Sequence, residues 1–201
     1  MARTSNLKER RYRRRLTLPS SGLAPAGRAT LALHFPFRAA CRREPLMSNV
    51  RPHKMQSRVA LRPSTQADAS FALQVRESTM RKYVEQTWGA WDAQEAHGQI
   101  QEDITLMRSQ VIELDGKPIG LMRIDEGPEH LDLDQIFIAS EYQRQGIGGF
   151  LIKQLIERSR ASRKPLRLWV LRVNPAVHFY ERMGFEVIDQ THASLRMQRA
   201  A

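Results

Sequence analysis

The stretch Gln143-Arg144-Gln145-Gly146-Ile147-Gly148 lies between an apolar segment and an amphipathic one, and it decides the fold. Residues 136–139 form a short apolar run typical of a buried strand, and apolar side chains recur at helical spacing over residues 150–156. The glycines therefore open a helix. A helix start presents unpaired N–H groups with roughly half a positive charge, and glycine lets an anion approach the backbone closely. The stretch predicts a strand-turn-helix unit that binds an anionic group such as a diphosphate.

Two familiar nucleotide sites do not fit this pattern. A dinucleotide-binding turn needs a third glycine and an acidic residue on a following strand, and a P-loop ends in Gly-Lys-Ser or Gly-Lys-Thr. Neither feature accompanies Gly146 and Gly148. Because a Gly-x-Gly pair by itself more often marks an ordinary turn, the assignment needs a second, independent stretch of sequence.

That second stretch begins at residue 166. Residues 166–173 alternate as a strand does, and Asn174-Pro175 then leads into a helix, whose first position suits proline. Gly184 is a suitable stop for this helix, and residues 185–188 begin a further strand. A second strand-helix-strand unit thus follows the first.

Together the two stretches resemble the GCN5-related N-acetyltransferases, the GNAT family. The acetyl-CoA site of that family has the form Gln/Arg-x-x-Gly-x-Gly/Ala at the start of the helix after the fourth strand, and residues 143–148 match it. The second signature, Asn-x-x-x-x-x-Tyr-Glu-x-x-Gly-Phe, is matched from Asn174 to Phe185. The resemblance implies an N-acetyltransferase that uses acetyl-CoA as its co-substrate and transfers the acetyl group to a primary amine by direct attack.

The same resemblance implies how acetyl-CoA is held. The backbone amides of residues 143–148 are expected to bind the diphosphate, with Arg144 adding positive charge. The backbone of Phe137 and Ile138 is expected to pair with the pantetheine arm as a neighbouring strand would.

Two residues of the second signature receive roles in the same way. Asn174 is expected to contact the cofactor, and Tyr180 to lie beside the thioester sulfur. The departing CoA thiolate has a pKa near that of cysteine, about 8.5, so a hydroxyl that protonates it lowers the barrier. Tyr180 is the candidate for this general acid, although a helical tyrosine before a Gly-Phe turn would otherwise be read as a core residue.

The order of the remaining elements favours an α+β fold with a mixed, mostly antiparallel central sheet flanked by helices, which is the GNAT fold. Asp115-Gly116 is a strong signal for a two-residue hairpin turn. The expected elements are a strand at 59–62, helices at about 66–80 and 93–107, a hairpin over 111–124, a strand at 131–138, the two units above, and final strands at 186–190 and 193–198.

A base is needed because an alkylamine with a pKa of about 10.4 is almost fully protonated at neutral pH, and removing its proton costs roughly 4–5 kcal/mol. Strict strand alternation would place Asp132 and Asp134 on one face of the strand together with Ile136 and Ile138. Asp132 falls where some family members carry a glutamate base and is the first candidate, with Asp134 second. Other members use a glutamate on the fifth strand, and Trp169 occupies that region here.

The acceptor amine is not specified by any signature. Tyr83, Trp88 and Trp91, in a stretch with acidic residues and a break at Gly89, form a candidate substrate-binding set that could surround a cationic amine. A packed junction of helices explains the same residues equally well. A GNAT-like regulator that binds CoA without turnover is the alternative to an enzyme.

Charge divides the chain into two parts. The chain has a net charge of +11, and residues 1–46, with ten arginines and Lys8 against Glu9 and Glu44, carry +9, which leaves +2 for residues 47–201. We expect 1–46 to be a disordered basic leader, because it lacks apolar residues to offset the entropy of ordering. An over-extended start before Met47 or Met55 is the favoured explanation, and a transit peptide or a nucleic-acid-binding arm are the alternatives. Residues 47–201 are expected to form one acetyltransferase domain.

Other features narrow the chemistry. The single cysteine, Cys41, lies in the leader, and the six histidines show no zinc-binding spacing, so we expect neither a thiol nucleophile nor a metal. No stretch has the length of a membrane span, and a cytoplasmic protein without nucleic-acid or membrane partners is expected. A homodimer is common in the family, but no heptad pattern specifies an interface.

Overall fold

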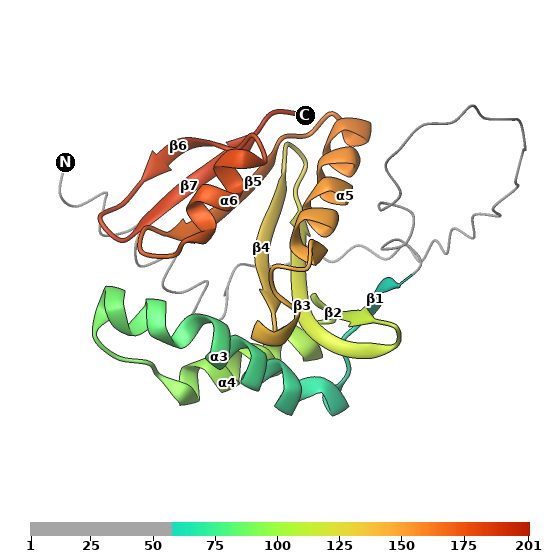
Figure 1. Ribbon diagram of the computed structural model, residues 1–201, viewed down its shortest axis with the longest axis vertical. Coiled ribbons are helices and arrows are strands. Elements are labelled where there is room, and N and C mark those ends of the chain that lie inside the picture. Colours follow the sequence, from blue (N-terminus) through green and yellow to red (C-terminus); the bar gives the residue numbers. More distant parts are fainter. Residues whose placement is uncertain (1–57) are drawn as a thin grey trace, which may run out of the picture.

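A seven-stranded sheet organises residues 58–201, the part of the chain that the computed structural model describes (Figure 1). The expectations about the leader at 1–46 concern residues outside this range. The strand order is β1-β2-β3-β4-β5-β7-β6. All neighbouring strands are antiparallel except β4 and β5, which are parallel. The strands are β1 (Val59–Pro63), β2 (Ser109–Leu114), β3 (Lys117–Glu126), β4 (Leu131–Ile138), β5 (Leu166–Leu171), β6 (Glu186–Gln190) and β7 (Ser194–Arg199).

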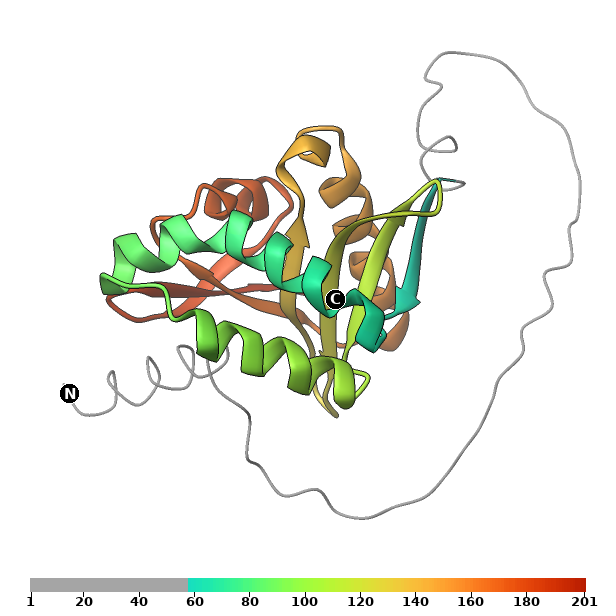
Figure 2. The same ribbon diagram turned by 90° about the horizontal axis from the view of Figure 1, so that it is seen from below.

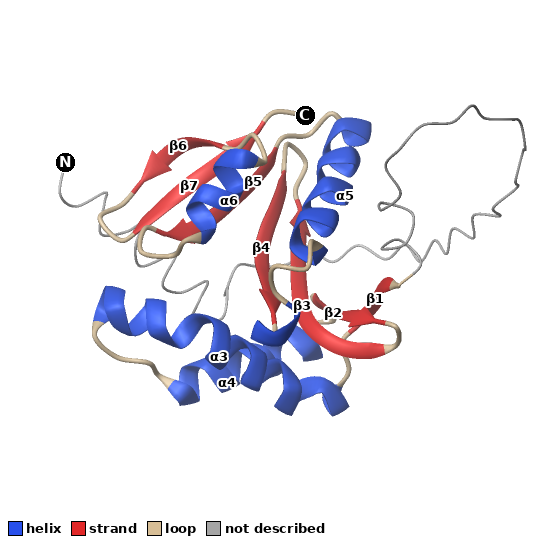
Figure 3. Ribbon diagram, in the orientation of Figure 1, coloured by secondary structure: helices blue, strands red, loops and turns tan. Residues whose placement is uncertain are grey.

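Helices cover both faces of the sheet. The α-helices are α3 (Ala69–Trp88), α4 (Ala93–Thr105), α5 (Ile147–Ser162) and α6 (Ala176–Arg182), and two short 3-10 turns are η1 (Gln66–Asp68) and η2 (Ser140–Tyr142). Figure 2 shows α3 and α4 together on one face, with α5 and α6 behind the sheet on the other. The mixed sheet with helices on both sides confirms the predicted α+β class (Figure 3). Within residues 58–201, no helix is both long and apolar enough to cross a membrane.

The alternation of neighbouring residues along the strands divides the core between the two faces. Ile112 and Met122 pack with α5 and α6, whereas their neighbours Val111 and Leu121 pack with α3 and α4. The α5 side contributes Leu151, Ile152, Leu155 and Ile156, the apolar face predicted after the glycines. Burial of this face, rather than intrinsic helix propensity, is what stabilises such a helix.

The predicted hairpin turn is confirmed. Asp115 and Gly116 have φ values of +52° and +78°, and Leu114 pairs with Lys117. Two positive φ angles in a two-residue loop match the right-handed twist of the flanking strands, which explains the Asp-Gly sequence.

The first long helix extends further than predicted. Instead of ending near residue 80, α3 continues to Trp88 and ends at Gly89, whose φ of +87° is the left-handed conformation that glycine tolerates. Tyr83 and Trp88 are therefore helical. Packing of Val84 against Leu171 of β5 stabilises the extra turns, a tertiary contact that local propensity does not reveal.

Strand β4 departs from strict alternation. Arg123 of β3 pairs with Gln135 and Ile124 pairs with Leu133, so that Asp134 lies between the two pairs as the extra residue of a β-bulge. The expectation that Asp132, Asp134, Ile136 and Ile138 share a face was wrong for this reason. Ile136 packs with the α5 side of the core, whereas Asp134 lies beside Arg123 on the α4 side.

Candidate active site

The two parallel strands at the centre of the sheet separate at their carboxyl ends. The pairing of β4 with β5 covers only Leu131–Leu166, Asp132–Arg167 and Leu133–Leu168, although both strands continue beyond these pairs. A cavity lies where they diverge. It is lined by Met80 of α3, residues 133–137 of β4, residues 168–171 of β5, and Asn174, Ala176 and Tyr180. The carboxyl end of parallel strands is where ligands of open sheets commonly bind.

Beyond Leu133, the edge of β4 that faces β5 is unpaired and is called the open edge here. The residues whose backbone groups point to this open edge differ from the predicted pair, Phe137 and Ile138. Phe137 pairs with Leu121 of β3, and a Cβ built on Gly120 of β3 would lie 2.2 Å from the Phe137 carbonyl oxygen. The Phe137 backbone therefore points to β3, away from β5. Because backbone groups alternate along a strand, Ile136 and Ile138 point to the open edge. Ile136 was not predicted, and that alternation was the signal that could have identified it.

Gln143 already uses one of these backbone groups. Its Nε2 donates a hydrogen bond of 2.7 Å to the Ile138 carbonyl oxygen. Gln145 Nε2 likewise donates to the Glu141 carbonyl oxygen at 2.8 Å. Both glutamine side chains thus fix the turn between β4 and α5 from within.

The turn opens onto the start of α5. Arg144 and Gly146 have left-handed φ values of +59° and +86°, and residues 144–146 are exposed. A Cβ added to Gly148 would meet only Ile138 Cδ1 at 3.6 Å, and one on Gly149 would meet nothing within 4 Å. The packing of the protein therefore does not require glycine at these two positions. Their missing side chains leave open the space beside the first-turn N–H groups of α5, as an anion site needs.

Tyr180 lies in the wall of the cavity and is buried. Its ring makes edge contacts with Phe179 and Phe185, at centroid distances of 5.2 and 5.6 Å. Burial raises the pKa of the Tyr180 phenol well above its ordinary value. The group therefore remains a protonated hydroxyl, able to donate, throughout the neutral range.

Asn174 lines the same cavity and lies two residues before the first residue of α6. Its side-chain Oδ1 accepts a hydrogen bond from the Ala176 N–H at 2.9 Å, and its backbone carbonyl accepts from the Val177 N–H at 3.1 Å. The side-chain oxygen is thus committed to the helix start, and the amide NH₂ is the part of Asn174 that can serve a ligand as a donor.

The two aspartates proposed as bases lie in different places. Asp134 lines the cavity with a side chain that is 5% exposed, 3.5 Å from Arg123 Nη1. Asp132 is not among the lining residues, and its Oδ2 lies 3.0 Å from His130 Nε2. Arg167 Nη1 donates to His130 Nδ1 at 3.2 Å, which leaves His130 Nε2–H as the donor to Asp132.

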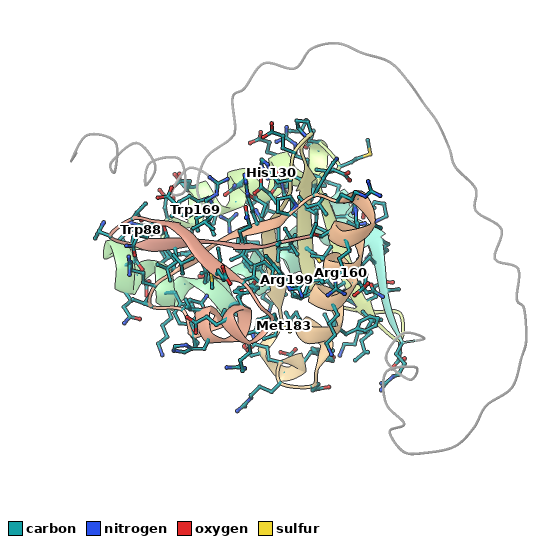
Figure 4. The ribbon with its side chains drawn as sticks, turned by 90° about the horizontal axis from the view of Figure 1, so that it is seen from above. Trp88, His130, Arg160, Trp169, Met183 and Arg199 are labelled. Carbon is teal, nitrogen blue, oxygen red and sulfur yellow. The ribbon has the colours of Figure 1, made fainter. Side chains whose placement is uncertain are left out.

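In Figure 4, His130, the partner of Asp132, lies well away from Met183. Met183 directly follows α6, the helix that contains Tyr180. The structure thus brings Asp134, not Asp132, together with Tyr180. The end of the β4–β5 pairing is the reason, because Asp132 is still paired with Arg167 whereas Asp134 lies beyond the last pair, Leu133–Leu168.

The aromatic residues proposed for substrate binding form a packed cluster beside the cavity. Tyr83, Trp88 and Trp91 surround Val84 and Leu171, and Trp88 and Trp169 appear at the same end of the molecule in Figure 4. None of the three proposed residues lines the cavity. Their neighbours Met80, Trp169 and Leu171 do, so the cluster forms an outer layer behind that wall.

Trp169 occupies the position considered for a fifth-strand base. The guanidinium carbon of Arg196 on β7 lies 5.7 Å from the centre of its ring, within the range of a cation–π contact. This part of the wall is therefore aromatic rather than acidic.

Comparisons with known proteins agree with this geometry. The family model described as "Acetyltransferase (GNAT) domain" matches residues 107–187. An uncharacterized N-acetyltransferase of Methanocaldococcus jannaschii is 34% identical over 43% of this chain and 42% of its own length. The alignment thus spans less than half of that relative.

Solved structures show the same fold. The PaiA N-acetyltransferase of Thermoplasma acidophilum, in complex with coenzyme A, matches with a TM-score of 0.53 and 18% identity over 71% of this chain and 99% of its own. An acetyltransferase of Thermus thermophilus matches with a TM-score of 0.59 and 18% identity over 72% of this chain and 97% of its own. The family model matches the part of the chain that contains both signatures, and the solved structures show that the chain has the fold of GNAT acetyltransferases.

Proposed function

We propose that the protein transfers the acetyl group of acetyl-CoA to a primary amine by direct attack in a ternary complex. The observation that carries this proposal is the cavity between the diverging ends of β4 and β5, which is lined by both Asp134 and Tyr180. The match of residues 107–187 to the GNAT family model supports the reaction class, and one protein with the same fold was solved with coenzyme A bound.

The residues present fit a CoA molecule. The first-turn N–H groups of α5, reached across Gly146 and Gly148, would hold the diphosphate, and Arg144 would add a positive charge. The open-edge backbone of Ile136 and Ile138 would hydrogen-bond the pantetheine arm. When bound there, acetyl-CoA supplies an acyl group activated as a thioester.

Two side chains would carry out the two proton transfers of the reaction, one from the amine and one to the leaving sulfur. Deprotonation of the amine costs roughly 4–5 kcal/mol at neutral pH, and Asp134 is the carboxylate in the cavity that can accept this proton, directly or through water. The neutral amine then forms the new C–N bond as the C–S bond breaks. Tyr180 donates its hydroxyl proton to the leaving sulfur and regains one from solvent or from the amine.

The wall of the cavity indicates what kind of acceptor fits. Asp134 is the sole acidic or basic side chain among the lining residues, and the rest of the wall is largely apolar or aromatic. A cationic amine on an apolar stem matches such a wall, whereas an anionic acceptor would be placed beside a carboxyl group of the same charge. The packed cluster of Tyr83, Trp88 and Trp91 would shape the outer part of the acceptor path.

The direct test uses the purified full-length chain, acetyl-CoA and a panel of amines that includes polyamines, amino-acid amides and peptides with free N-termini or lysines. Thiol release is followed continuously, and acetylated products are identified by mass spectrometry. We expect release that depends on an amine and is lost in Gly146→Glu. Tight CoA binding by calorimetry without transfer to any amine would instead identify a CoA-binding regulator.

A further inference from the structure

A buried network of charges lies behind Asp134. Arg123 of β3 is at its centre, with a side chain that is 9% exposed. Its Nη1 donates to Asp103 Oδ1 of α4 at 2.7 Å, and its Nη2 donates to Asp125 Oδ2 at 2.8 Å. The same Nη1 lies 3.5 Å from Asp134 Oδ2. One guanidinium therefore faces three carboxylates.

Asp103 holds this guanidinium in one orientation. Its second oxygen, Oδ2, accepts a hydrogen bond of 3.1 Å from Gln135 Nε2, the residue next to the bulge. Asp103 thus links α4 to both β3 and β4. Because the fork of an arginine is planar and rigid, fixing it at Asp103 and Asp125 also fixes the position of the positive charge beside Asp134.

A second buried arginine acts on the same group at longer range. Arg76 of α3 is 2% exposed, and its Nη2 donates to Gln99 Oε1 at 2.7 Å. Burial lowers the pKa of Arg76 to about 10, against the attraction of Asp103 and Asp134, so Arg76 stays charged at neutral pH. For Arg123, burial acts in the same direction but is outweighed by its hydrogen bond to Asp125 and by the charges of Asp134 and Asp103, which raise its pKa.

Around Asp134, Arg123 of β3 contacts its carboxyl group, Arg76 of α3 acts on it at longer range, Asp103 of α4 shares Arg123 with it, and Tyr180 of α6 lines the same cavity. A carboxylate this buried would be driven toward its neutral form by desolvation alone. Arg123 contacts this carboxylate with its positive charge. The cation is itself outside the cavity wall, so it acts on the reaction through Asp134.

We propose that Arg123 is a positioning residue that holds Asp134 ionised and oriented toward the cavity, with Asp103 and Asp125 fixing the guanidinium in place. This inference rests on the proposed function, in which Asp134 meets the acceptor amine. It adds a link from α4 through Asp103 and Arg123 to the cavity. The bulge in β4 makes that link, because it brings Asp134 to the same face as Arg123.

The experiment compares Arg123→Gln and Arg123→Lys in the full-length protein. The first removes the charge, and the second keeps the charge but loses the planar fork. The carboxyl carbon of Asp134 is observed by NMR with ¹³C-labelled aspartate and assigned with Asp134→Asn. We expect Arg123→Gln to move the titration midpoint of Asp134 upward by about one pH unit, the size of effect that one adjacent cation exerts. Arg123→Lys should leave the midpoint nearly unchanged while lowering kcat/KM about tenfold through lost orientation.

A matched control is Arg62→Gln. Arg62 also bridges two carboxylates, Asp68 and Glu113, each at 2.7 Å, but it lies on β1, an edge strand that neighbours neither β4 nor β5. The Arg62→Gln variant should be less stable than the wild type, and the titration midpoint of Asp134 should be unchanged in it. Circular dichroism and CoA calorimetry establish that each variant is folded.

The outcomes separate this inference from the proposed function. An unchanged Asp134 titration in folded Arg123→Gln would overturn the positioning role. If that variant does not fold, a wild-type kcat/KM in Arg123→Lys would overturn it. By contrast, a wild-type protein that acetylates no amine would contradict the proposed function even where the titration moves as expected.

Discussion

Asp134 on β4 and Tyr180 on α6 line the same cavity, although Asp132, two residues earlier on β4, does not. A carboxylate and a protonated phenol at one site are the two groups that an acyl transfer from a thioester to an ammonium requires, one for each proton. Their proximity arises where β4 and β5 stop pairing after Leu133 and Leu168. The divergence of the two strands thus both opens the cavity and brings its two titratable groups together.

Replacing Tyr180 by phenylalanine tests the general acid. The ring contacts with Phe179 and Phe185 remain, so the variant is expected to fold and to bind CoA nearly as well as the wild type. Loss of the hydroxyl should lower kcat about 10²-fold. Because burial raises the pKa of Tyr180, the wild-type rate should show no loss from phenol ionisation below about pH 10. Steady-state kinetics against pH measure both effects, and an equal loss of CoA affinity and kcat would argue against the acid role.

The two aspartates of β4 give opposite expectations. Asp134→Asn should reduce kcat/KM for the amine by at least about 10²-fold, because the cavity loses its carboxylate. Asp132→Asn should change it little, since Asp132 is paired with His130 away from the cavity. Steady-state kinetics on both variants decide between the candidates. Inactive Asp132→Asn beside active Asp134→Asn would restore the order of preference that the sequence suggests.

The predicted diphosphate site at the start of α5 can be tested by substituting two glycines that have the same backbone conformation. Gly146 and Gly89 have φ values of +86° and +87°, so a side chain costs about 1 kcal/mol of strain at either position. Gly146→Glu should abolish detectable CoA binding, because it adds bulk and a like charge where the diphosphate is expected. Gly89→Glu at the end of α3 should lose similar stability yet bind CoA normally. Calorimetry with coenzyme A gives the result, and equal affinities in the two variants would exclude this diphosphate site.

Close approach of β3 to β4 makes Gly120 the glycine most sensitive to a methyl group. A Cβ at Gly120 would lie 2.2 Å from the Phe137 carbonyl oxygen and 3.2 Å from Ile112 Cδ1. Gly120→Ala should therefore reduce the free energy of unfolding by about 1–3 kcal/mol or more, as overpacking does. In Gly98→Ala the added Cβ meets nothing within 4 Å and lies in helix α4, so that change should stabilise by about 0.5–1 kcal/mol. Denaturant unfolding of both variants provides the comparison, and a stable Gly120→Ala would contradict the contact.

Much of the fold could be predicted from local patterns. Asp115-Gly116 predicted the hairpin, because the required pair of positive φ angles is a property of those two residues alone. Residues 143–148 predicted a helix start for the same kind of reason, and α5 begins at Ile147. Where the expectation failed, at the end of α3, the helix depends on packing against β5, a strand distant in the sequence.

The sequence by itself determined that a strand, a turn and a helix succeed one another twice, and its two signatures pointed, through the family they resemble, to Tyr180 and to the turn at Gly146. Only the tertiary structure decided which aspartate reaches the cavity and which backbone groups of β4 face its open edge. Those choices depend on a one-residue bulge at Asp134 in the pairing with β3 and on the point where β4 leaves β5. A shift of one residue in strand register reverses the face of every side chain that follows, and register is set by partners far along the chain.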